Sequence, residues 1–189
     1  IADYTLVMDL LWPEQSSQQW RALLQTDITN ISDADLYTNK ANAIGIATTE
    51  SGYFGNLNAG EWHRLAFVFY AAPTNGALKI YLDGKLIGVK DEGEINQRWA
   101  IDKATLLLTD NDYETEPGYL NALLFAGRAM TDNEIASLGA AKQQLNYVRS
   151  TRILNHVVER HYQTAPQIMN NPWLQQRSKF FNKQRQSVN

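Results

Sequence analysis

The sequence has 189 residues, a formal net charge of −3 and no cysteine. The lack of cysteine excludes disulfide bonds and thiol chemistry, and no apolar run approaches the ~18 residues that a membrane-spanning helix requires. With 44% hydrophobic residues, the chain can form the core of one domain, or of one domain with an appendage.

Charge is distributed unevenly along the chain. Residues 1–139 hold 19 acidic and 9 basic side chains, whereas residues 140–189 hold 1 acidic and 8 basic side chains. This asymmetry predicts two regions with different roles, a domain over 1–139 and a basic extension or linker over 140–189.

The predicted elements of the first region are strands. Alternation over 4–12 places Leu6, Met8, Leu10 and Trp12 on one face of a strand. The segment 62–70, WHRLAFVFY, carries apolar residues on both faces of the predicted strand. This pattern is typical of a central strand buried between two layers. Shorter strand candidates occupy 20–25, 34–39, 42–49, 105–109 and 119–127.

A hairpin gives the clearest local signal. Asp83 and Gly84 stand between two β-prone runs in LKIYLDGKLIGV (78–89), and an Asp-Gly pair favours a tight two-residue turn. Many short strands separated by turn residues indicate an all-β sandwich.

The pattern changes to helical after residue 130. Thr131 and Glu134 form a capping box, and Gly139 can end the short helix that follows. Residues 140–162 predict a longer helix with Tyr147 and Leu154 on its apolar stripe.

Four segments, in this order, resemble the laminin-G-like, concanavalin-A-like jelly-roll family. They are YTLVMDLLWP (4–13), GEWHRLAFVFY (60–70), GALKIYLDGKLIG (76–88) and GYLNALLFAGRAMTDNEIASLG (118–139). The resemblance implies a jelly-roll β-sandwich, followed here by an α-helical extension. The chain departs from the family at Asn121 and Ala122, where members usually carry acidic residues, and it lacks an early strand that often holds ligand residues.

The family resemblance also implies a function. Its members are mostly extracellular modules that bind glycans or proteins, many hold calcium, and bacterial members often accompany a hydrolase. We therefore expect a non-catalytic binding module with carbohydrate as its ligand, in a secreted or cell-surface bacterial protein. Its location would be extracellular, periplasmic or at the cell surface, although this chain shows no signal peptide. The alternative is an interaction domain that docks a protein partner or an adjacent catalytic domain of the same polypeptide, and a third possibility is a hydrolase with an unrecognised site.

The sequence contains no catalytic motif that would support the hydrolase possibility. Glucanases of this fold carry carboxylates spaced Glu-x-Asp-x-x-Glu, and neither DEGEI (91–95) nor DNDYETE (110–116) has that spacing. His63 has the chemistry of a general base, but its place at the start of a predicted central strand favours a structural role. No catalytic residue is predicted.

Sugar binding requires an aromatic platform beside polar groups. Trp20, Tyr37, Tyr53, Trp99 and Tyr113 lie in or near predicted loops and strand ends. Any of them can instead belong to the core, where most aromatics of a sandwich lie. The predicted ligand-binding residues are Trp99 with its polar neighbours, and two tyrosines: Asn96, Gln97, Arg98, Trp99, Tyr113 and Tyr37.

A second candidate site is the acidic loop DNDYETE. Asp110, Asp112 and Glu114 alternate, and calcium favours several carboxylate oxygens. An EF-hand is excluded because the sixth position is Thr115 rather than glycine. A solvated acidic loop is the alternative, and calcium is the only cofactor expected.

The basic extension carries no nucleic-acid-binding motif, and its charges are spread among glutamines. We expect it to be an interface or a linker, and we expect neither a nucleic-acid partner nor a transmembrane segment.

Overall fold

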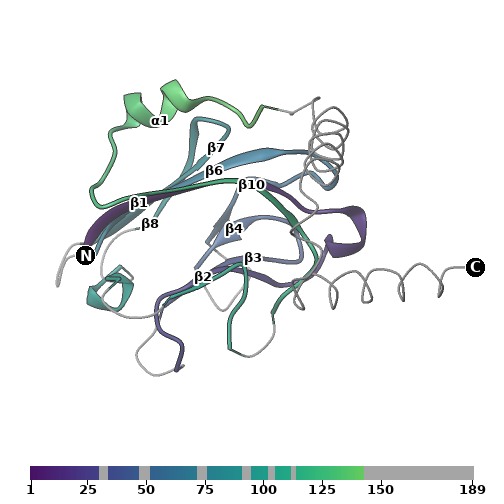
Figure 1. The fold of residues 1–189 in the computed structure, drawn as a ribbon, viewed down its shortest axis with the longest axis horizontal. Coiled ribbons are helices and arrows are strands. Elements are labelled where there is room, and N and C mark those ends of the chain that lie inside the picture. The colour runs from purple at the N-terminus through teal and green to yellow at the C-terminus, as the bar shows by residue number, and fades with distance from the viewer. Residues whose placement is uncertain are drawn as a thin grey trace, which may run out of the picture. The chain divides into compact units, whose positions relative to one another are not determined.

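The computed structural model of this chain describes residues 1–29, 34–46, 52–71, 76–90, 95–101, 105–111 and 114–142. These residues form two antiparallel five-stranded sheets, two short 3-10 helices and one α-helix (Figure 1). Almost all of the predicted basic extension lies outside the described residues. Within the described part of the chain, every helix is too short or too polar to cross a lipid bilayer.

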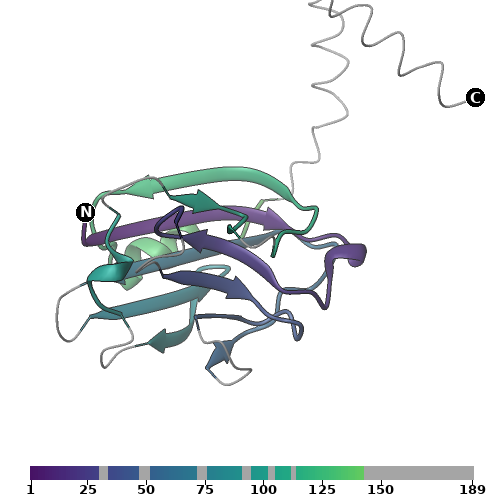
Figure 2. The same cartoon turned by 90° about the horizontal axis from the view of Figure 1, so that it is seen from below.

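The first sheet has the strand order β10-β1-β6-β7-β8 (Figure 2). Every neighbouring pair in it is antiparallel. Its strands are β1 (Asp3–Leu11), β6 (His63–Tyr70), β7 (Ala77–Leu82), β8 (Lys85–Lys90) and β10 (Tyr119–Ala126).

The second sheet has the order β5-β4-β3-β2-β9. Its strands are shorter: β2 (Arg21–Gln25), β3 (Asp35–Thr38), β4 (Ile44–Gly45), β5 (Tyr53–Phe54) and β9 (Leu106–Leu107). The 3-10 helices η1 (Glu14–Ser16) and η2 (Gln97–Trp99) lie in the connections.

The main core fills the space between the sheets. The inward face of β1 contributes the predicted row of Leu6, Met8 and Leu10, and Trp12 continues the row beyond the end of the strand. Burial of these apolar side chains is the principal force that holds the two sheets together.

Strand β6 is apolar on both faces because both faces are covered. Leu65 and Phe67 point into the core between the sheets, whereas Ala66 and Val68 belong to a second cluster on the opposite face. That face is covered by helix α1 (Asp132–Leu138), whose Ile135 is 1% exposed (Figure 1). The prediction of a strand buried between two layers is confirmed.

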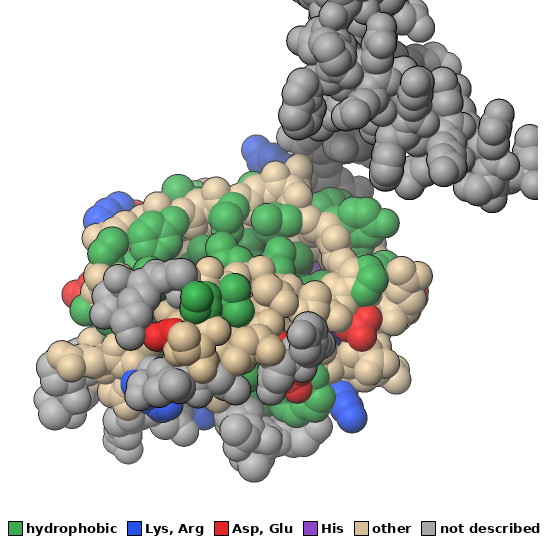
Figure 3. Space-filling model, turned by 60° about the horizontal axis from the view of Figure 1, so that its bottom comes forward, with side chains coloured by type: hydrophobic (Ala, Val, Ile, Leu, Met, Phe, Trp, Pro, Cys, Tyr) green, Lys and Arg blue, Asp and Glu red, His purple; other side chains and the backbone are tan. Residues whose placement is uncertain are grey.

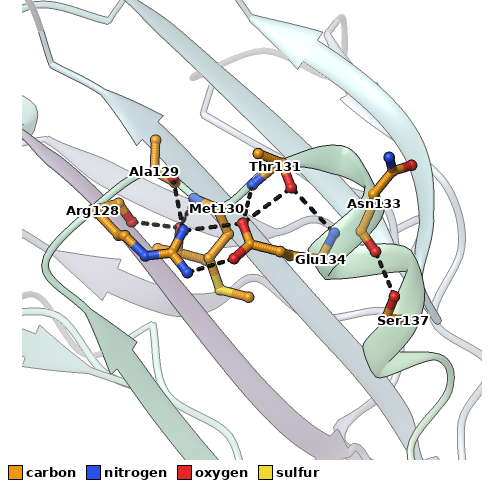
Figure 4. Close-up of polar contacts among 8 residues, drawn as sticks. Arg128, Ala129, Met130, Thr131, Asn133, Glu134 and Ser137 are labelled. Atoms are coloured by element: carbon orange, nitrogen blue, oxygen red, sulfur yellow. Dashed lines mark hydrogen bonds and ion pairs between the residues drawn. The ribbon is translucent and has the colours of Figure 1, made fainter.

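Helix α1 begins with the predicted capping box. The Thr131 hydroxyl accepts from the Glu134 amide, and the Glu134 carboxylate accepts from the Thr131 amide (Figure 4). Arg128 pairs with the same carboxylate. These contacts lower the pKa of Glu134 to about 2, the hydrogen bond from Arg128 being the largest cause. The helix ends at Gly139, whose φ of 62° is in the left-handed region.

The predicted hairpin joins β7 to β8. Asp83 and Gly84 have φ values of 52° and 80°, and Leu82 pairs directly with Lys85. Two successive positive φ values define the type of two-residue turn that matches the twist of antiparallel strands.

Candidate functional site

Three aromatic side chains share the outer face of the second sheet. In β3, Tyr37 lies between the buried Leu36 and Thr38, so its ring points away from the core. The register places Tyr37 beside Gly45 and Gly45 beside Tyr53. The two tyrosines therefore flank a residue that has no side chain.

Trp20 joins these tyrosines just before β2 begins. Its ring centroid lies 6.0 Å from that of Tyr37 and 5.7 Å from that of Tyr53, with edge-to-face angles of 86° and 73°. A Cβ atom at Gly45 would lie 2.9 Å from the Tyr53 ring, so this position leaves the tyrosine ring where it can contact the indole. Trp20, Tyr37 and Tyr53, each partly exposed, form what we call the aromatic cluster.

Asn42 contacts residues on both sides of Trp20. Its side-chain oxygen accepts from the amide of Gln18 at 3.2 Å and from Nη2 of Arg21 at 2.7 Å, and its amide nitrogen donates to the hydroxyl of Ser17. One side chain thus ties residues before and after Trp20 to the turn between β3 and β4. Asn42 carries no signal in the sequence, because these contacts exist only after the turn has folded against Arg21, the first residue of β2.

Arg21 anchors this arrangement from inside the sandwich. Its side chain is 1% exposed, and its guanidinium carbon lies 5.0 Å from the centre of the Trp12 ring. Burial lowers the pKa of Arg21 to about 10, while the charge of Glu116 acts in the opposite direction. A buried arginine held by an aromatic ring and an amide restricts the position of the adjacent Trp20.

Polar groups lie on the same sheet beside the aromatic cluster. Asp35 is two residues before Tyr37 in β3 and pairs with Gln25 of β2. Gln25 exchanges two hydrogen bonds with Asn111, of 3.1 and 2.9 Å. Gln25 itself is fully buried, so the polar side chains that remain at the surface here are Asn111 and the partly exposed Asp35. Flat apolar rings near an amide and a carboxylate suit a sugar ring and its hydroxyls.

The predicted site around Trp99 has a different arrangement. Trp99 is 3% exposed and stacks on Phe69 in the core at a centroid distance of 5.4 Å. Asn96 accepts from the amide of Arg98 and so caps η2. The structure places the Trp99 ring away from solvent and leaves the side chains of Gln97 and Arg98 exposed. The carbonyl of Arg98 accepts from the hydroxyl of Thr26, just after β2. A binding role for these residues stays a prediction.

The acidic loop lies against β2. The backbone oxygen of Glu114 accepts from the amide of Ala22, the residue that pairs with Tyr37 across the sheet. This contact brings the loop to the side of the aromatic cluster. Tyr113 and Asp112, two predicted site residues of this loop, lie outside the described residues.

One feature of Asp110 favours cation binding, namely a buried carboxylate oxygen without a partner among the described residues. Oδ1 accepts from the amide of Glu114 at 2.9 Å, but Oδ2 is buried and has no hydrogen-bond partner among the described residues. Such an oxygen is costly to bury unless a positive charge or a donor approaches it. No group of three potential metal-ligating side chains occurs in the part of the chain that is described, and that part does not include Asp112. The calcium site stays a prediction.

His63 links two of the four segments that resemble the laminin-G-like family, GEWHRLAFVFY and the hairpin segment that holds Asp83. Its Nδ1 atom lies 2.9 Å from Oδ2 of Asp83, whose Oδ1 accepts from the amide of Arg64. Its Nε2 atom is buried. Arg64 in turn forms a bidentate pair with Asp9 and donates to the carbonyl of Leu138 at the end of α1. These contacts favour the structural role expected for His63.

Comparisons with known proteins support the fold and no family assignment. No family model matches the chain, and no curated protein matches its sequence. Among solved structures, the CBM40 module of Ruminococcus gnavus IT-sialidase, bound to alpha2,3 sialyllactose, has a TM-score of 0.53 and 15% identity, covering 74% of this chain and 83% of that one. Mutant HCR/D has a TM-score of 0.52 and 10% identity over 72% of this chain and 37% of its own.

Trypanosoma rangeli sialidase also matches, with a TM-score of 0.49 and 16% identity over 72% of this chain. The chain spans only 22% of that enzyme. At 15% and 10% identity, the similarity to the CBM40 module and to mutant HCR/D shows the fold alone. The predicted fold, a mainly β jelly-roll sandwich, is confirmed, while membership of the laminin-G-like, concanavalin-A-like family stays a prediction.

Proposed function

We propose that this chain is a non-catalytic carbohydrate-binding module and that the aromatic cluster is its platform. The observation that carries this proposal is the mutual contact of three partly exposed rings on one face of a sheet, with the partly exposed Asp35 on the same face. The apolar face of a sugar ring would stack on these rings, and its hydroxyls would bond to the polar groups. The fold is similar to that of a module bound to alpha2,3 sialyllactose, which supports glycan binding but, because that glycan is anionic, not the class of glycan.

The cluster is held in place before any ligand arrives. Asn42 bonds to the Gln18 amide and to the Arg21 guanidinium on either side of Trp20, and Tyr37 and Tyr53 lie on hydrogen-bonded strands. A rigid aromatic surface loses little conformational entropy when it binds, which favours affinity for weak ligands such as sugars.

Charge indicates the class of glycan. Residues 1–139 carry 19 acidic and 9 basic side chains, and Asp35 lies on the same sheet face as the cluster. Anionic sugars would be repelled by this surface, so we propose a neutral glycan as the ligand. The proposed setting is a secreted or cell-surface protein, in which the module binds the glycan without altering it.

Calcium is a proposed accessory to this site. Asp110 and Glu114, together with Asp112, would hold the ion, and its charge would neutralise the carboxylates of a loop that is bonded to β2. Its role would be to order the loop beside the cluster.

A glycan array with the full chain tests the proposal, followed by calorimetric titration of the strongest ligand. We expect Trp20→Ala to weaken binding by more than tenfold, because a central tryptophan typically contributes about 2 kcal/mol or more to an interface. The control is Tyr119→Ala, which removes an aromatic ring that is 59% exposed on the other sheet. A wild-type chain that binds no glycan, or equal affinity of wild type and Trp20→Ala, would contradict the proposal.

A further inference from the structure

Strand β10 is an apolar edge strand with both faces exposed. Five of its eight side chains are large and hydrophobic, and they retain 44–59% of their accessible surface: Tyr119, Leu120, Leu123, Leu124 and Phe125. The register directs Leu123 and Phe125 to the same side as the core residues Met8 and Leu6. They remain exposed there because β9, the nearest edge of the second sheet, has only two residues. Figure 3 shows hydrophobic side chains gathered along the upper part of the described region, the side on which β10 lies in Figure 2.

The other three sheet edges of the described structure are protected. β5 and β9 have two residues each, and β8 is flanked by Lys85 and Lys90. Short strands and lysines are the usual means by which proteins prevent a sheet edge from pairing with another chain. β10 has eight residues, no charge and no proline, so it is the one long edge here that is open to pairing.

The size pattern of β10 is symmetric about Leu124. The five residues from Ala122 to Ala126 read small, large, large, large, small. If a second copy of the strand pairs in antiparallel orientation with Leu124 opposite Leu124, then Phe125 lies opposite Leu123 and Ala126 opposite Ala122. The register with β1 places each of these pairs on a common face of the sheet. All five positions are then matched in size and apolar character.

We propose that β10 is a homodimer interface, in which two copies pair edge to edge about a twofold axis through Leu124. The pairing would join two five-stranded sheets into one of ten strands, which is within the size of open sheets in known proteins. A twofold contact is closed, so each copy protects the edge of the other and no fibre forms.

Two further observations concern the surface around β10. Residues 1–139 are strongly acidic, which opposes the association of two copies, but β10 carries no charge and so adds no repulsion at the proposed contact. In addition, a cavity of about 180 Å³ lies beside Leu124, lined mainly by apolar residues such as Val7, Ala122 and Leu138. Leu124 of a second copy would add apolar surface at the rim of this cavity.

Sedimentation velocity of the full chain over a wide concentration range tests the proposal. We expect a reversible dimer, and we expect Leu124→Lys to weaken dimerisation at least about tenfold, because two ammonium groups would meet at the twofold axis. The matched control is Val89→Lys, which introduces the same charge at a position of β8 that is 42% exposed. It should leave the dimer unchanged.

A cysteine variant tests the register without altering charge. Because the chain has no cysteine, Leu124→Cys can form a disulfide only between two copies. Directly opposed residues in an antiparallel pair have Cα atoms about 4.5–5.5 Å apart, which suits a disulfide. Mild oxidation should give a covalent dimer with Leu124→Cys and much less with Val89→Cys.

A wild-type chain that is monomeric at all concentrations, or that dimerises equally well with Leu124→Lys, would overturn the proposal. Equal cross-linking of the two cysteine variants would do the same. Glycan binding by Leu124→Lys should match that of the wild type, so the outcome here is independent of the aromatic cluster.

Discussion

Replacing Asp83 tests how the histidine motif and the hairpin motif act together. In Asp83→Ala the carboxylate that binds His63 Nδ1 and the Arg64 amide is lost, and alanine must adopt a φ of 52°. Asp83→Asn is the informative comparison. Asparagine tolerates positive φ and its side-chain oxygen can still accept from the Arg64 amide.

The magnitude follows from these contacts. Hydrogen bonds to a charged group contribute about 1.5–3 kcal/mol each, and the 29% exposure of the Asp83 side chain places both near the lower end. Alanine in the left-handed region costs about 1–2 kcal/mol more. We therefore expect Asp83→Ala to lower the free energy of unfolding by about 4–5 kcal/mol and Asp83→Asn by about 1–2 kcal/mol.

Urea unfolding followed by circular dichroism and tryptophan fluorescence measures both variants. For a domain of this size, the loss in Asp83→Ala corresponds to a fall in melting temperature of roughly 8–20 °C. If Asp83→Ala costs less than about 1 kcal/mol, or if Asp83→Asn costs as much as Asp83→Ala, then Asp83 does not act through these two contacts.

Three further predictions concern the site, the helix and the acidic loop. Gly45→Ala should lower the free energy of unfolding by about 1–3 kcal/mol in urea and weaken glycan binding in titration. The reason is that the alanine Cβ would lie 2.9 Å from the Tyr53 ring. The control Gly127→Ala, where a Cβ would meet no atom closer than 4.0 Å, should change neither quantity. The hydrogen bonds that lower the pKa of Glu134 to about 2 stabilise the fold above pH 4.5 and lose their effect as the pH falls from 4.5 toward 2. The difference in melting temperature between wild type and Glu134→Gln should therefore shrink over that range, and a constant difference would contradict it. Calcium should raise the melting temperature of the wild type but not of Asp110→Asn, and a chelator should reverse the effect; no calcium response in the wild type would remove the calcium proposal.

The fold could be predicted from the sequence where its signals are local. The alternation over 4–12, the Asp83-Gly84 turn and the Thr131 capping box each depend on neighbouring residues, and the structure confirms all three. Strand β5 was not predicted, because Tyr53 and Phe54 are too short a run to show a period.

The candidate site could be predicted only in part. Tyr37 was identified from its residue type and its place near a strand end, and the structure places it in the aromatic cluster. Trp99 has the same signals, with polar neighbours in addition, yet it stacks on Phe69 in the core. Residue type alone does not distinguish these two aromatics, since exposure depends on which segments of the chain cover each ring.

The all-β class of the fold follows from local signals, because strand periodicity, turn residues and helix caps are properties of short segments. The position of GEWHRLAFVFY relative to the hairpin likewise assigns that stretch to the framework. Which surfaces are available depends instead on how distant segments pack. Trp20, Tyr37 and Tyr53 come from three separate segments and meet because strand register places Gly45 between the two tyrosines. Likewise, the sequence of β10 has the pattern of an ordinary apolar strand. Its side chains are exposed because β9 is too short to cover them.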